Sequence, residues 1–171
     1  PGGSAAVSLT GTAGWTFTGV DVVPPNDGTG AAYLITDSVD LKIVGGYCDG
    51  SYDDNPTLYG IKANNVKGLK LTGAGFWNLG RSALHWTDVK RSSVTGCAFS
   101  QNNKSDDSYP DIDLYSSQDN TFTACTFGAG VARTNKGLIY RQDASSASNV
   151  VAACTLNTAS GAHYYDSAVP W

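Results

Sequence analysis

The chain contains no glutamate and no methionine, and all 15 of its acidic residues are aspartate. Glutamate and methionine favour helices, whereas aspartate, asparagine, serine and glycine favour turns and helix caps. This balance argues against a helical bundle and against an alternating strand–helix fold with long helices. The 20 glycines among 171 residues point the same way. The composition is typical of an all-β protein with many turns.

Basic residues are also few: the 11 Lys and Arg are scattered along the chain, and the net charge is −4. A protein that binds nucleic acid through its phosphates needs a basic patch, so we expect no nucleic-acid partner. No apolar run approaches the roughly 18 residues of a membrane span, so we expect no membrane partner.

The chain does not open with the charged and then apolar segments of a secretion signal. It opens instead with Pro1-Gly2-Gly3-Ser4, which is typical of a linker. We expect residues 1–14 to be a linker or entry segment, and the chain to be a fragment of a longer one.

Six copies of a short pattern run through the sequence, each with a strand that bends at a small residue in its middle. Aligned on their third residue, the copies are spaced by 23 to 29 residues. Every member of that column is apolar: Phe17, Ile43, Leu71, Val94, Phe122 and Val151. The column five residues further on is also apolar: Val22, Cys48, Phe76, Phe99, Phe127 and Leu156.

A second strand follows in each copy, for example at 58–63, 83–88 and 111–116. Repeats of short strands without a helix indicate a stacked β-solenoid, whereas a leucine-rich repeat of similar period has a different consensus. We predict an all-β fold, a right-handed parallel β-helix of about six coils of 23–29 residues, as a single domain over 15–171. Open ends on so short a stack would expose sheet edges, which again favours a fragment.

The four cysteines fall in inward columns, Cys97, Cys125 and Cys154 in one and Cys48 in the next. Equivalent side chains on stacked coils run parallel about 4.8 Å apart, beyond the usual Cβ separation of a disulfide. We therefore predict free, buried thiols, which suits folding in a reducing cytosol. No C-x-x-C pair occurs, so we expect no metal site.

The pattern of VDLKIVGG (39–46), VKGLKLTGAGF (66–76) and SSVTGCAF (92–99) resembles the right-handed β-helices of the pectate-lyase-like superfamily. It is most similar to the β-helix bodies of bacteriophage tailspikes and tail-fibre depolymerases. The resemblance implies recognition of bacterial surface polysaccharide, with cleavage by hydrolysis or by a lyase reaction. It also implies a homotrimer on a virion tail, folded in the host cytoplasm.

Two alternatives stay open, because the catalytic motifs of polygalacturonases and pectate lyases do not occur in order in this sequence. One is a non-enzymatic structural β-helix segment of a viral tail protein. The other is a secreted polysaccharide lyase or epimerase of the same superfamily.

Alternation along the second strands predicts one outward column: Lys62, His85, Asp113 and then Tyr140, or Arg141 if that coil is shifted. Asp111 lies two residues before Asp113 on the same predicted face. Glycoside hydrolysis needs two carboxyl groups, about 5–5.5 Å apart for retention or about 6.5–9.5 Å for inversion. Asp113 and Asp111 are therefore candidate catalytic residues, with His85 tuning Asp113. A solvated surface bears the same residue types, so a non-catalytic face is the alternative.

Loop lengths predict a notch over the third coil, since the loops at 49–56 and 101–110 are longer than the one at 78–81 between them. Sugar rings bind to aromatic faces flanked by polar groups. We expect substrate binding by Lys62, Arg81, Trp77, Trp86, Tyr140 and Arg141. Trp86 shares the inward parity of Leu84, so a core position is the alternative for it. No cofactor is expected.

Overall fold

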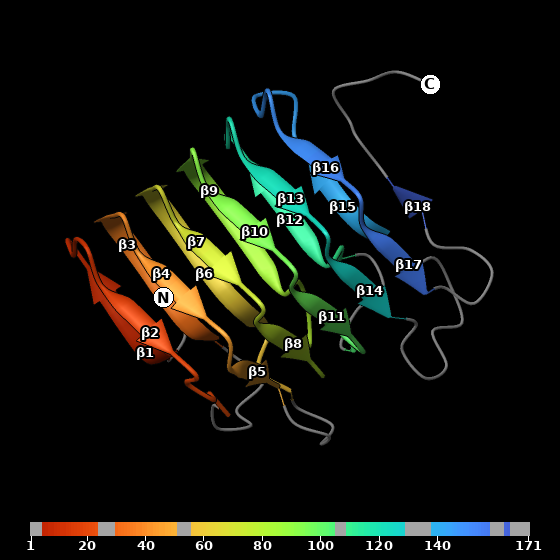
Figure 1. Cartoon of the computed structure of the whole chain (residues 1–171), viewed down its shortest axis with the longest axis horizontal. Coiled ribbons are helices and arrows are strands. Elements are labelled where there is room, and N and C mark those ends of the chain that lie inside the picture. The colour runs from red at the N-terminus through yellow and green to blue at the C-terminus, as the bar shows by residue number, and fades with distance from the viewer. Residues whose placement is uncertain are drawn as a thin grey trace.

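The computed structural model describes residues 5–23, 30–50, 56–104, 109–128, 138–157 and 163–164. These residues form a parallel β-solenoid in which short strands stack in sequence order from one end to the other (Figure 1). Three parallel sheets run along the stack, with seven, six and five strands. The described ranges contain no helix, and therefore none long and apolar enough to cross a membrane.

The seven-stranded sheet carries the longest strands. Its members, in spatial order, are β1 (Ala5–Thr10), β3 (Ala31–Val39), β6 (Tyr59–Lys67), β9 (Leu84–Lys90), β12 (Ile112–Tyr115), β15 (Leu138–Gln142) and β18 (His163–Tyr164). β1 lies inside the segment that we predicted as a linker or entry segment, and it pairs with β3 from Ala5 to Thr10. The sheet thus extends further toward the N-terminus than the repeat alone predicted.

The other two sheets consist of three-residue strands joined by tight bends. The six-stranded sheet contains β2 (Thr16–Thr18), β4 (Lys42–Val44), β7 (Lys70–Thr72), β10 (Ser93–Thr95), β13 (Thr121–Thr123) and β16 (Val150–Ala152). The five-stranded sheet contains β5 (Tyr47–Asp49), β8 (Gly75–Trp77), β11 (Ala98–Ser100), β14 (Thr126–Gly128) and β17 (Thr155–Asn157).

The register of these sheets confirms both apolar columns. In the six-stranded sheet the Cα partners run Phe17, Ile43, Leu71, Val94, Phe122, Val151. In the five-stranded sheet the second column follows in the same way, from a bridge between Val22 and Cys48 to the pair Phe127–Leu156. Because equivalent residues stack directly, one apolar position per coil is enough to build a continuous core.

The bend between these two sheets has a left-handed backbone in every coil. Gly73 has φ of 63°, whereas Ala124 and Ala153 hold φ values of 52° and 53° at equivalent positions. This conformation costs a residue with a Cβ about 1–2 kcal/mol, and glycine adopts it without that cost. The small residues in the middle of each sequence copy are therefore the corners of the coil.

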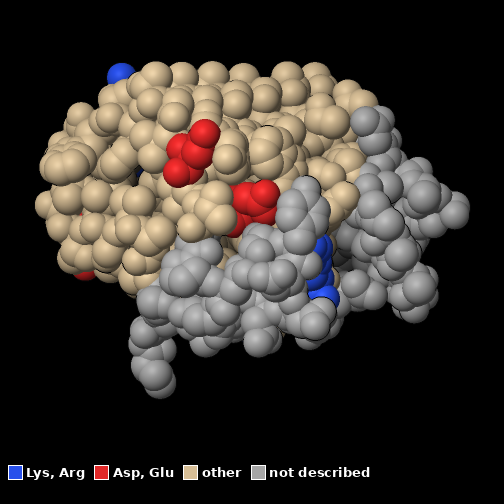
Figure 2. All heavy atoms as spheres, turned by 90° about the horizontal axis from the view of Figure 1, so that it is seen from below, with Lys and Arg blue, Asp and Glu red and all other residues tan. Residues whose placement is uncertain are grey.

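The core is a set of side-chain ladders between the sheets. Phe76, Phe99 and Phe127 stack with ring planes 10° apart and centroids 5.2 and 4.9 Å apart. Trp86 is fully buried and packs on Phe122 with centroids 5.6 Å apart. The described surface visible in Figure 2, by contrast, carries only sparse charged side chains.

All four cysteines are free thiols, as predicted. Cys48, Cys97 and Cys125 are buried, and Cys154 is half-buried. Burial raises the thiol pKa of Cys48 and Cys97 and raises that of Cys125 to about 12. These three sulfurs therefore carry little thiolate, the form that reacts with electrophiles.

We expect iodoacetamide to modify Cys154 first in the folded protein and the other three cysteines much more slowly. In denaturant without reductant, all four should react. Mass spectrometry of the intact protein and its peptides measures both patterns. A mass two units low before reduction would reveal a disulfide and contradict the prediction.

Candidate functional site on the seven-stranded sheet

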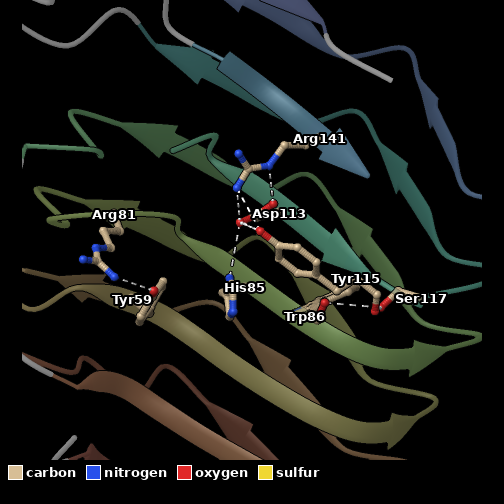
Figure 3. Close-up of polar contacts among 8 residues, drawn as sticks. All are labelled: Tyr59, Arg81, His85, Trp86, Asp113, Tyr115, Ser117 and Arg141. Atoms are coloured by element: carbon tan, nitrogen blue, oxygen red, sulfur yellow. Dashed lines mark hydrogen bonds and ion pairs between the residues drawn. The ribbon is translucent and has the colours of Figure 1, made fainter. Parts of the chain in front are cut away.

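One polar column crosses the outer face of the seven-stranded sheet. The Cα partners on successive strands are Lys62 on β6, His85 on β9, Asp113 on β12 and Arg141 on β15. The column is the predicted one, with Arg141 rather than Tyr140 in the last place. Figure 3 shows His85 and Arg141 converging on Asp113 from the strands on either side of it.

Asp113 is at the centre of this cluster, and its side chain is fully buried. Arg141 donates hydrogen bonds from Nε to Oδ1 (2.8 Å) and from Nη2 to Oδ2 (2.7 Å). The Tyr115 hydroxyl donates to Oδ2 at 3.2 Å and accepts from Arg141 Nη2 at 3.0 Å. Such a two-point contact between a guanidinium and a carboxylate fixes both groups in orientation.

The same contacts keep Asp113 ionised. Burial by itself raises the pKa of Asp113, but the contacts from His85 and Arg141 and the Arg141 charge outweigh it, so the pKa lies below its ordinary value. Burial, together with the Asp113 charge, raises the pKa of the Tyr115 hydroxyl. Tyr115 therefore keeps its proton and holds it against the carboxylate.

The lowered pKa of Asp113 predicts that stability is lost in acid. A carboxyl group whose folded-state pKa is depressed stabilises the fold above its unfolded pKa of about 3.9, and this contribution disappears as the pH falls through the folded-state value. We expect the urea midpoint to fall as the pH drops below about 4, and to fall less steeply in Asp113→Asn.

Asp88→Asn is the matched control for that measurement. Asp88 pairs with Lys90 at 2.7 Å, but both side chains are about 40% exposed. Exposed ion pairs contribute little to stability, so this variant should keep the acid dependence of the parent chain. An unchanged slope in Asp113→Asn would contradict the prediction.

His85 lies beside Asp113 with its ring between two tyrosines. Its Nδ1 is 3.4 Å from Asp113 Oδ2, an ion-pair distance without good hydrogen-bond geometry. The ring centroids of Tyr59 and Tyr115 lie 4.9 and 5.3 Å away. The His85 side chain is 19% exposed, so the cluster opens to solvent at this ring.

Two cationic side chains contact Tyr59, whose ring lies next to that of His85. Lys62, its partner on β6, is exposed, and its Nζ lies 5.5 Å above the Tyr59 ring. Arg81 donates from Nη1 to the Tyr59 hydroxyl at 3.1 Å and stacks 4.6 Å from the Tyr109 ring. Lys62 and Arg81 thus both contact Tyr59, whereas Arg141 contacts Asp113 on the other side of His85.

Four predicted site residues lie elsewhere, and three of them are buried. Asp111 is 2% exposed and accepts a hydrogen bond from Asn102 Nδ2 at 2.9 Å, so the prediction of an open pair with Asp113 is wrong. Tyr140 pairs with Ile112 and points inward, where its hydroxyl donates to Gln142. Trp86 is a core residue, because it shares the inward parity of Leu84.

Trp77 belongs to a different sheet from the polar column. It is half-buried on β8, 5.3 Å from the Tyr47 ring. The longer loops that predicted a notch include residues 51–55 and 105–108, which lie outside the described residues. The notch itself therefore stays a prediction.

Two aromatic residues of the cluster were not predicted. Tyr115 lies two residues after Asp113 on one strand, so strand alternation could have placed it on the same face. Tyr59 has the inward parity of Ile61 but stands at the first position of β6, where its ring reaches His85. Only the tertiary structure could assign that contact.

The cluster combines a fixed carboxylate, a partly exposed imidazole and nearby cations. A base held by an oriented carboxylate, next to positive charge, can remove a proton from carbon and stabilise the negative charge that develops. Among the residues that the structure describes, no three His, Cys or Asp side chains come together as metal ligands. The carboxylate, imidazole and phenol groups of the cluster offer acid–base chemistry.

No protein-family model matches the chain, and no curated protein matches it. Among solved structures, the A-module of mannuronan C-5 epimerase AlgE4 from Azotobacter vinelandii is similar, with 11% identity and a TM-score of 0.49. The match covers 92% of this chain and 54% of that module, so the chain spans about half its length. Similarity at this level carries no inference about activity.

Proposed function

We propose that this chain binds an acidic polysaccharide on the outer face of the seven-stranded sheet and removes the proton next to a sugar carboxylate. The observation that carries the proposal is the position of His85 between the ionised Asp113 and the cation Lys62. The resulting reaction is that of a lyase or an epimerase, which was an alternative in the sequence analysis.

His85 is the base in this reaction. Asp113 Oδ2 lies 3.4 Å from Nδ1, so its negative charge favours the tautomer with the proton on Nδ1 and leaves Nε2 to accept a proton from the substrate. Arg141 and Tyr115 are positioning residues, because they fix Asp113 rather than reach the substrate.

Lys62 neutralises the substrate carboxylate. A proton on the carbon next to a carboxylate is removed only if the second negative charge on that group is stabilised. The Lys62 ammonium lies on the strand next to His85 and has no ion-pair partner among the described residues. Arg81, held by Tyr59, adds positive charge on the same side.

The removed proton leads to one of two products. In a lyase, the C5–H bond breaks, a C4–C5 double bond forms and the C4–O bond breaks, with a proton delivered to the departing oxygen. In an epimerase, a proton returns to C5 from the opposite face and the polymer stays intact. Tyr59, whose ring centroid lies 4.9 Å from that of His85, has a hydroxyl group that could donate the proton in either reaction.

Hydrolysis by Asp111 and Asp113 has less support. A glycosidase needs one protonated carboxylic acid, and its pKa must be raised. The pKa of Asp113 is lowered by its contacts with His85 and Arg141, although burial opposes them. The buried side chain of Asp111 is held by Asn102.

The proposed substrate source and assembly follow the resemblance of the sequence to phage tailspikes. We propose a bacterial surface polysaccharide with uronate units as the substrate, and a homotrimer on a virion tail as the assembly. The net charge of −4 repels an acidic polymer in general, so binding depends on the local cluster of Lys62, Arg81 and Arg141.

The test is an assay of the chain on polymannuronate, polygalacturonate and, as a neutral control, dextran. A lyase produces ultraviolet-absorbing unsaturated ends, and an epimerase in heavy water incorporates deuterium at C5 without shortening the polymer. New reducing ends without unsaturation would favour the hydrolase instead. Binding without any reaction would favour a recognition module, and neither binding nor reaction would favour a structural segment.

A further inference from the structure

A polar cavity lies at the turn that leads from the seven-stranded to the six-stranded sheet. It has a volume of about 240 Å³ and is lined by Gly14, Asp40, Lys42, Gly68 and Lys70. This is smaller than the roughly 300–1,000 Å³ of a site for a drug-sized ligand. None of its residues belongs to the cluster around His85.

The cavity forms because two glycines flank one aspartate at equivalent turn positions. Gly14, Asp40 and Gly68 have φ values of 71°, 52° and 74°, and each turn is tied to the next coil by its backbone N–H. A Cβ at Gly68 would approach Asp40 Oδ1 to 2.7 Å. The missing side chains on both sides of Asp40 therefore leave the space open.

Two lysines meet at one side of this space. Lys42 on β4 and Lys70 on β7 are Cα partners, and both are exposed. Like charges directly opposite one another on adjacent strands destabilise a sheet. Within the described part of the chain, neither ammonium has an ion-pair partner. A bound anion would neutralise both and remove their repulsion.

Asp40 restricts which anion can bind. Its carboxylate repels a simple inorganic anion that fills the cavity, but it accepts hydrogen bonds from hydroxyl groups. The matching ligand has a negative charge at one end and hydroxyl groups at the other. A single uronate unit of a polysaccharide has this chemistry.

We propose that this cavity is a second subsite, which holds a uronate unit of the polymer away from the reacting sugar. The substrate class rests on the proposed function, whereas the cavity and its charges do not. β6 runs from the His85 cluster to this turn, and the five residue steps from Lys62 to Lys67 span about 17 Å. Lys42 and Lys70 bind the carboxylate and Asp40 accepts the hydroxyl groups.

The test is a titration of the ¹⁵N-labelled chain with a uronate trisaccharide, followed by amide chemical shifts. We expect shifts at the Gly14, Asp40 and Gly68 amides, besides those at His85 and Asp113. The double variant Lys42→Gln/Lys70→Gln should weaken binding at the turn by about tenfold and leave the shifts near His85 in place.

The matched control is Lys67→Gln/Lys90→Gln. These lysines are also Cα partners, on β6 and β9, and their loss removes the same charge outside the cavity. This control should keep affinity at the turn within about twofold. If both double variants lost affinity at the turn to the same extent, binding would depend on general charge attraction, and the proposal would be wrong.

Two further results separate this proposal from the function proposed above. Sodium sulfate that binds at the turn as tightly as the trisaccharide would overturn the assignment to a sugar. Product formation without shifts at Gly14 and Gly68 would overturn the subsite alone. Shifts at the turn without any reaction would support the subsite and contradict the catalytic proposal.

Discussion

Replacing His85 with glutamine is expected to slow the reaction on a uronate polymer by about 10²–10⁴-fold, the usual loss when a general base is removed. Glutamine keeps the shape and polarity of the side chain but accepts no proton. The loss should fall on kcat, because the base acts in the transition state rather than in substrate binding. Initial rates of unsaturated-end formation, or of deuterium exchange at C5, measure it.

Two further variants test whether the loss of activity is specific to the cluster. Lys62→Gln changes a second residue of the cluster, and Asn64→Ala is the control outside it. Lys62 is placed to bind the sugar carboxylate, so its loss should raise KM as well as lower kcat. Asn64 is an exposed residue two positions further along β6, outside the cluster, and its loss should change neither by more than about twofold. A His85→Gln variant with full activity would place the base elsewhere.

Replacing Phe99 with alanine is expected to lower the free energy of unfolding by about 3–5 kcal/mol. Phe99 is 1% exposed and stacks between Phe76 and Phe127, with centroids 5.2 and 4.9 Å away. Its removal leaves a cavity in the middle of the ladder, and the strands of neighbouring coils cannot close it without losing their register. Urea unfolding followed by circular dichroism gives the value.

Val44→Ala is the comparison for Phe99→Ala. Val44 lies on the outer face of β4 and is 38% exposed, so its loss should change stability by about 0.5 kcal/mol or less. Both substitutions remove an apolar side chain from a three-residue strand. If Phe99→Ala cost no more than Val44→Ala, the ladder would not be the source of the fold's stability.

The repeat, the register of the two apolar columns and the first three members of the polar column could be predicted from the amino-acid sequence. A parallel stack places equivalent residues directly over one another, so aligning the copies on Phe17, Ile43 and their successors was the same operation as aligning the strands. The side-chain period of two then assigned Lys62, His85 and Asp113 to one face. No long-range information was needed, because each coil contacts the next in sequence order.

Contacts between neighbouring coils, which strand alternation does not specify, determine how that face is covered and which groups remain accessible. Alternation places Asp113 outside the sheet, but Arg141 and Tyr115 close over it, and this makes it a buried, ionised positioning residue instead of an acid. Arg141 rather than Tyr140 completes the column because the register of β15 against β12 pairs Tyr140 with Ile112. The length of the preceding loop does not specify that register, so it could be known only after the strands had paired.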